Sequence, residues 1–136
     1  MYEVFAHTAD AGLRIRASDL AALFEDAGRG LFSLIVANPE SIRPQTRSDF
    51  EVNGGDAEYL LVDWLSELLF AFESQRMLFS QFQVSIDDDG LKAIAWGERI
   101  DLARHRLEHE VKAITYHGLS VNKDDDGWSA EVVVDI

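Results

Sequence analysis

Cysteine is absent from the 136-residue sequence, and proline occurs only twice. The lack of cysteine excludes disulfides, thiolate metal sites and a Cys–His nucleophile. No apolar run approaches the ~18 residues that a membrane-spanning helix needs. The N-terminal residues lack the basic start and the apolar stretch of a secretory signal, so the sequence predicts a cytoplasmic protein without a membrane anchor.

Basic residues are also scarce: 12 Lys and Arg stand against 25 Asp and Glu, which gives a formal net charge of −13 at pH 7. Proteins that bind nucleic acids derive most of their affinity from basic residues that neutralise phosphates. We therefore expect no strong direct binding to nucleic acids. An acidic surface attracts a basic protein or a cation, although it also serves simply to keep a protein soluble.

The length and composition are typical of one folded domain. Hydrophobic residues make up 47% of the sequence and charged residues 27%, a balance that favours a packed core over disorder. There is no internal repeat and no linker rich in Pro, Gly or Ser. We predict a single domain over residues 1–136.

Two segments, 19–37 and 56–76, carry apolar residues at spacings of three and four. This spacing places the apolar side chains on one face of a helix. Ser18 and Asp56 stand where N-cap residues are expected. An apolar stripe of this kind indicates core packing rather than a cofactor site.

The other segments alternate between apolar and polar residues or end at turn residues, which predicts strands. The predicted strands cover residues 2–6, 12–17, 46–53, 78–86, 91–97, 111–117, 118–122 and 128–135. Turns that end in Asp-Gly join 78–86 to 91–97 and 118–122 to 128–135. The predicted fold is α+β: a two-layer sandwich of a mainly antiparallel sheet with both amphipathic helices on one face.

Histidines and runs of aspartate are weak candidates for chemistry. His105 and His109 are four residues apart, but the segment lacks the glutamate of the zinc-protease pattern and carries Arg106, which opposes a dication. We predict that both are solvated loop histidines. The aspartate triplets at 87–89 and 124–126 lack the alternate spacing of a calcium-binding loop, so they are predicted to form turns.

Carboxylates near opposite ends of the sequence offer one further candidate site. Asp10 lies between two predicted strands, and Asp135 is followed by Ile136, whose α-carboxylate is another anionic group. If the folded chain brings these groups together, a hard cation or a basic side chain must relieve their repulsion. The sequence leaves the alternative of a turn aspartate and a frayed tail open.

Three segments, in order and over nearly the whole chain, resemble the archease family. His-Thr-Ala-Asp-Ala-Gly-Leu-Arg-Ile at 7–15 looks like its N-terminal motif, and Leu-Val-Asp-Trp-Leu-Ser-Glu-Leu-Leu at 61–69 is similar to its helical motif. Val-Lys-Ala-Ile-Thr-Tyr-His-Gly-Leu at 111–119, with a last strand ending in Val-Asp-Ile, looks like its C-terminal half. Ser66 and Ala11 depart from the residues common in the family, and neither is a proposed ligand.

The resemblance implies a non-catalytic cofactor of an RtcB-type RNA ligase, which joins tRNA halves during tRNA splicing. Archeases promote guanylylation of the ligase and its multiple turnover. The resemblance also implies a site for calcium, or another hard divalent cation, formed by Asp10, Asp135 and the terminal carboxylate of Ile136. Lys112 and His7 are the residues expected to contact the partner.

Two other functions stay open. The family resemblance also allows a chaperone-like modulator of a tRNA methyltransferase. A metal-dependent hydrolase built on His7, Asp10 and His117 would be an enzyme, but the sequence has neither a nucleophile elbow nor a phosphate-binding loop. We therefore predict no catalytic activity.

Overall fold

The computed structural model describes residues 1–6 and 9–136, apart from the side chain of Ala6. In chain order its elements are β1 (Tyr2–Ala6), β2 (Asp10–Ala17), α1 (Leu20–Ile35), the short 3-10 helix η1 (Pro39–Ser41), β3 (Thr46–Asn53), α2 (Ala57–Gln75), β4 (Met77–Asp87), β5 (Gly90–Arg99), β6 (Ala113–Ile114), β7 (Ser120–Asp124) and β8 (Gly127–Asp135). The predicted helices and strands are all present, although the strand expected at 111–117 is reduced to β6.

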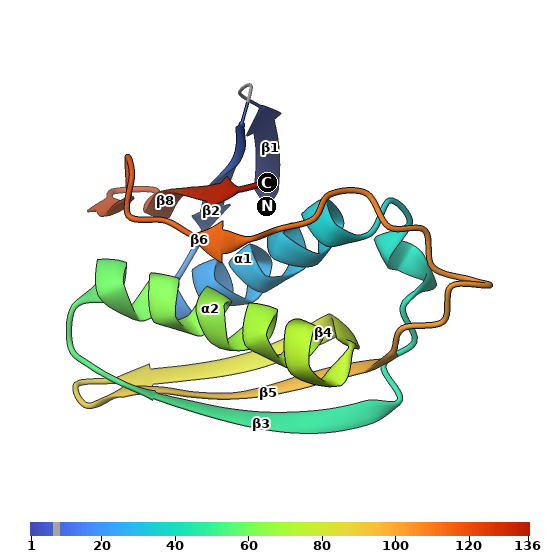
Figure 1. The fold of residues 1–136 in the computed structure, drawn as a ribbon. Coiled ribbons are helices and arrows are strands. Elements are labelled where there is room, and N and C mark those ends of the chain that lie inside the picture. The colour runs from blue at the N-terminus through green and yellow to red at the C-terminus, as the bar shows by residue number, and fades with distance from the viewer. Residues whose placement is uncertain (7–8) are drawn as a thin grey trace.

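The described strands form two antiparallel sheets (Figure 1). One has the order β1-β2-β8-β6, with β7 also paired to β8, and the other has the order β3-β5-β4. Every strand pair in both sheets is antiparallel. The predicted α+β class with antiparallel pairing is confirmed.

The helices lie between the two sheets rather than on one face of a single sheet (Figure 1). Helix α1 contacts β1, β2 and β8 on one side and β4 on the other, and α2 contacts β6 and β7 as well as β3, β4 and β5. The layers are therefore sheet, helices and sheet, which corrects the expected two-layer arrangement. The physical reason is that α1 is apolar and buried around most of its circumference.

Two glycines of α1 let both sheets approach the helix. A Cβ on Gly28 would lie 2.9 Å from Cε1 of Phe82 in β4, and a Cβ on Gly30 would lie 3.0 Å from Cδ2 of Leu13 in β2. Residues two apart on an α-helix point in nearly opposite directions. The apolar stripe seen in the sequence describes only one of these two faces.

Aspartates cap the N-termini of both helices. Asp19 accepts a hydrogen bond from the N–H of Ala22 at 2.8 Å. The helix begins at Leu20, so Asp19 replaces the predicted Ser18 as the N-cap. Asp56 accepts from the N–H groups of Glu58 and Tyr59 at 2.9 and 3.3 Å, as predicted.

Trp64 of α2 is fully buried at the centre of the helical layer. Its Nε1–H donates to the carbonyl of Phe24 in α1 at 2.9 Å. Its ring meets Phe50 of β3 and Phe82 of β4 edge-on, with centroids 5.5 and 6.2 Å apart. The stripe of α2 is therefore core, as predicted, and Trp64 joins both helices to the three-stranded sheet.

Residues 100–112 run along the C-terminal end of α1. The N–H of Ala37 donates to Arg106 O at 2.7 Å, and the N–H groups of Glu108 and His109 donate to Ile35 O and Leu34 O at 2.9 and 3.0 Å. The bonds to Ile35 and Leu34 satisfy carbonyls that the end of a helix leaves without partners.

The prediction of a solvated loop histidine is wrong for His105, which is 1% exposed. Its Nδ1 accepts the N–H of Asp101 at 2.9 Å, so Nε2 carries the proton and donates to Oε2 of Glu98 at 3.0 Å. The segment closes onto the buried Glu98, a contact that local spacing does not reveal. His109 lies in the same segment and is partly exposed.

The aspartate triplets form turns, as predicted. Oδ1 of Asp87 accepts from the N–H groups of Asp89 and Gly90 at 2.8 and 3.1 Å. Oδ1 of Asp124 accepts from the N–H of Asp126 at 2.8 Å.

Among the described residues, no helix is long and apolar enough to cross a membrane.

Candidate functional site

Asp10 and Asp135 lie opposite each other on neighbouring strands. β2 pairs with β8 in a register that sets Asp10 against Asp135, and β6 sets Ala113 on the other side of Asp135. Directly opposed residues of an antiparallel pair point to the same face, with Cβ atoms roughly 4.5–5.5 Å apart. The fold thus brings together two carboxylates that are far apart in the sequence.

Both carboxylates are on the face of the five-stranded sheet that points away from the helices. The neighbouring residues Ala11 and Val134, which also oppose each other, are buried in the core. Because side chains alternate along a strand, Asp10 and Asp135 point outward. The site therefore lies on an accessible face of the molecule, at the end of the β2–β8 ladder.

Main-chain hydrogen bonds fix the surroundings of the pair. The N–H of Ile136 donates to the carbonyl of Ala9 at 3.4 Å, and the N–H of Lys112 donates to the carbonyl of Asp135 at 2.8 Å. Ile136 therefore lies beside the residue that precedes Asp10. Asp10, Asp135 and Ile136, the three predicted ligands, are neighbours in space.

One oxygen of Asp10 is buried without a partner. Oδ1 of Asp10 has no hydrogen-bond donor within residues 1–6 and 9–136. A buried carboxylate oxygen without a donor is costly, and a second carboxylate opposite adds repulsion. A cation or a basic side chain could supply the missing electrostatic partner of this oxygen and relieve the repulsion between the two carboxylates.

The donor set is suited to a hard cation. Carboxylate and main-chain oxygens are the ligands that Ca²⁺ prefers, and it completes its shell of six to eight oxygens with water. In the part of the chain that the structure describes, no three or more His, Asp or Glu side chains are arranged so that they could hold a metal ion together. Among the described residues, main-chain oxygens such as those of Ile136 could supply a third protein ligand.

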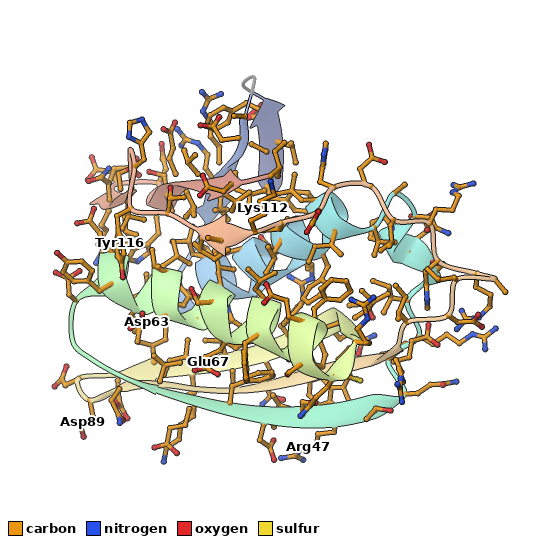
Figure 2. All side chains as sticks on the ribbon, viewed as in Figure 1. Arg47, Asp63, Glu67, Asp89, Lys112 and Tyr116 are labelled. Carbon is orange, nitrogen blue, oxygen red and sulfur yellow. The ribbon has the colours of Figure 1, made fainter. Side chains whose placement is uncertain are left out.

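Of the predicted partner contacts, Lys112 lies next to this pair and His7 falls outside the described residues. Lys112 is exposed at the start of β6 (Figure 2). Its main-chain N–H donates to the carbonyl of Asp135. His117, the other histidine of the hydrolase hypothesis, is exposed, and no hydrogen bond joins it to Asp10 among the described residues.

Phe5 and Gly12 lie near the Asp10–Asp135 pair, and the sequence patterns do not predict this. They oppose each other in the β1–β2 register, and a Cβ on Gly12 would lie only 2.0 Å from Cζ of Phe5. The guanidinium carbon of Arg14 lies 4.2 Å from the centroid of the Phe5 ring, and Arg14 Nε donates to Glu131 at 2.8 Å. The sequence signal is a glycine two residues after Asp10, at a position where the ring needs a residue without a Cβ.

The sequence matches the Archease protein family (MTH1598/TM1083) over residues 2–136. Protein archease of Methanopyrus kandleri is 40% identical over 139 residues, which cover 99% of each chain. Protein archease of Methanosarcina mazei is 39% identical over 140 residues, which cover 99% of this chain and 95% of the relative.

Solved structures agree with this assignment. The solution structure of Methanobacterium thermoautotrophicum protein 1598 superimposes with a TM-score of 0.86 at 36% identity, over 99% of this chain and 98% of the other. The crystal structure of a Thermotoga maritima archease superimposes with a TM-score of 0.67 at 20% identity, over 100% of this chain and 98% of that one, and supports the fold alone. With the family matched over nearly its full length and relatives near 40% identity, the chain belongs to the archease family.

Proposed function

We propose that this protein is a non-catalytic cofactor of an RtcB-type RNA ligase that acts in tRNA splicing. It promotes guanylylation and multiple turnover of the ligase, and it carries a calcium site built on Asp10 and Asp135. The observation that supports the proposal is the opposed pair of carboxylates, in which one enclosed oxygen has no hydrogen-bond partner among residues 1–6 and 9–136. Membership of the archease family supports the proposal, because the family resemblance implies an RtcB-type ligase as partner.

The charge of the protein is consistent with this role. A net charge of −13 disfavours autonomous RNA binding and favours docking on a basic, RNA-binding ligase. Asp10, Asp135 and main-chain oxygens of Ile136 would hold the cation. The cation would supply positive charge on an otherwise acidic surface, next to the exposed Lys112, where phosphate groups of the partner's substrate could be met.

The test is a guanylylation assay of the cognate ligase with and without the protein. Wild type is expected to stimulate guanylylation, and Asp10→Asn and Asp135→Asn are expected to abolish the stimulation, because each keeps the side-chain size but removes a charged ligand. Asp125→Asn, which removes one charge from the exposed β7–β8 turn, is the matched control and is expected to stimulate like wild type. Absence of stimulation by wild type would overturn the proposed function, and full stimulation by Asp10→Asn would overturn the role of the cation.

A second candidate is a chaperone-like modulator of a tRNA methyltransferase. It is favoured only by the Thermotoga maritima relative, which is described as an archease and possible chaperone. This function predicts co-purification with a methyltransferase and an altered set of methylated products, without stimulation of the ligase. Turnover of RNA or nucleotide by the isolated protein would contradict both candidates.

A further inference from the structure

The exposed face of α2 is not covered by either sheet. Helix α2 lies in the middle layer with one side turned to solvent (Figure 1). Residues on this side recur at helical spacing: Tyr59, Asp63, Ser66, Glu67, Phe70 and Glu73. Asp63, Glu67 and the neighbouring Tyr116 lie on the side of the molecule shown in Figure 2.

Aromatic side chains mark this face. Tyr59 is 60% exposed and Phe70 is 64% exposed. They are eleven residues apart, close to three full turns, so they lie on one line about 16 Å long. Tyr116, from the loop between β6 and β7, is 58% exposed and extends this line beyond the start of the helix, where its ring meets Tyr59 edge-on at 5.7 Å.

The carboxylates of α2 have no basic partners on the helix. Helix α2 contains Glu58, Asp63, Glu67 and Glu73 and no Lys or Arg. None of the four forms an ion pair in the described part of the chain. The macrodipole favours the negative charge of Glu58 in the first turn and disfavours that of Glu73 near the C-terminus. Exposed carboxylates without local partners, such as Asp63, Glu67 and Glu73, are typical of a surface that binds a partner.

We propose that the exposed face of α2, with Tyr116, docks on a basic surface of a protein partner. Asp63, Glu67 and Glu73 would meet Lys and Arg side chains of the partner, and Tyr59, Phe70 and Tyr116 would supply apolar anchors and faces for its cations. The like charge of a second copy and the phosphates of a nucleic acid both repel this face. That the partner is the ligase rests on the proposed function. The docking face itself rests on the exposed aromatic and acidic side chains of α2.

The docking face is separable from the carboxylate pair. The carboxylate pair is on the outward face of the five-stranded sheet, and α2 belongs to the middle layer. Docking through α2 would therefore bring the protein to its partner, and the carboxylate pair would act once it is there. Mutations in the two places are expected to give different defects.

The experiment measures the affinity of the intact protein for the purified cognate ligase by calorimetry, at low and at moderate salt. The double variant Asp63→Asn/Glu67→Gln is expected to weaken binding by about tenfold or more and to make it less sensitive to salt. The double variant Asp88→Asn/Asp125→Asn removes the same charge from two exposed turns and is expected to bind within about twofold of wild type. Tyr59→Ser/Phe70→Ser tests the apolar anchors, and circular dichroism confirms that each variant is folded.

Asp10→Asn separates the two proposals. It is expected to bind the ligase like wild type and to fail only in stimulating guanylylation. If wild type binds and stimulates but both α2 variants bind equally well, the docking face is overturned and the proposed function stands. If wild type neither binds nor stimulates the ligase, the proposed function is overturned together with the identity of this partner.

Discussion

Glu98 is a carboxylate enclosed at the end of β5, with 7% of its surface exposed. It accepts the N–H of Arg43 at 2.7 Å and the Nε2–H of His105 at 3.0 Å, and it forms an ion pair with Arg104. Burial raises the pKa of Glu98, but these three donors lower it by more, so the folded pKa lies below its usual value. Glu98 therefore remains charged and anchors residues 100–112 to the core.

Replacing Glu98 with glutamine is expected to lower the free energy of unfolding at neutral pH by roughly 2–3 kcal/mol, because the amide accepts fewer hydrogen bonds and loses the ion pair. The folded pKa is depressed, so the stabilisation by Glu98 is present above its unfolded pKa of about 4.3 and is lost as the pH falls through the folded pKa. The difference between wild type and Glu98→Gln should therefore narrow in strongly acidic solution. Urea unfolding at neutral and acidic pH measures it.

The control for this prediction is Asp49→Asn, which breaks the exposed ion pair with Arg47. Its effect on the free energy of unfolding is expected to stay below about 0.5 kcal/mol. If Glu98→Gln is as stable as wild type at neutral pH, the network around Glu98 does not stabilise the fold.

At the scale of elements, β4 is an edge strand that α1 partly protects. In the order β3-β5-β4, one side of β4 faces away from its sheet. There Glu25 of α1 accepts the N–H of Val84 at 2.9 Å. An unpaired edge invites pairing with another chain, and this bond removes one of the donors that such pairing needs.

Glu25→Ala is expected to expose the N–H of Val84 and to cost about 1–2 kcal/mol of stability, together with an increased tendency to aggregate on warming. Glu25→Gln keeps an acceptor at the same place and should behave nearly like wild type. Chemical unfolding measures the loss of stability, and light scattering during slow heating measures the aggregation. Equal scattering from Glu25→Ala and Glu25→Gln would show that this bond does not protect the edge.

The elements differ in how far the sequence predicts them. The period of α2 and the cap at Asp56 are local features, and both are confirmed. The apolar stripe of α1 predicts burial of one face only, and Gly28 and Gly30 do not by themselves indicate that a second sheet packs on the other face. The sequence does not predict the contact between Glu98 and His105, because that contact depends on how the loop closes.

At the scale of the whole molecule, the candidate site depends on a strand pair between distant parts of the chain. The residues Asp10 and Asp135 could be proposed from the family resemblance and from their chemistry. Their register, and the enclosure of one Asp10 oxygen, could not be predicted because no local periodicity encodes pairing between β2 and β8.

If the pair holds a cation, binding should stabilise the entire fold, since the site exists only when β2 and β8 are joined. Calcium alone at about 100 times its dissociation constant is expected to add ~2.7 kcal/mol. For a domain of this size, this corresponds to a rise in Tm of roughly 6–12 °C. Asp10→Asn should lose this rise and Asp125→Asn should keep it, as measured by thermal melts in calcium and in a chelator. An equal rise in Asp10→Asn would place the cation elsewhere on the acidic surface.

The central place of β8 has a consequence for biosynthesis. β8 joins β2 to both β6 and β7, yet it follows all of them in the chain. During translation the β1–β2 hairpin can form early from local contacts, but its partner strand leaves the ribosome only after every other element has been made. The five-stranded sheet therefore closes last, and a nascent chain interrupted before β8 would carry Asp10 without the opposing carboxylate.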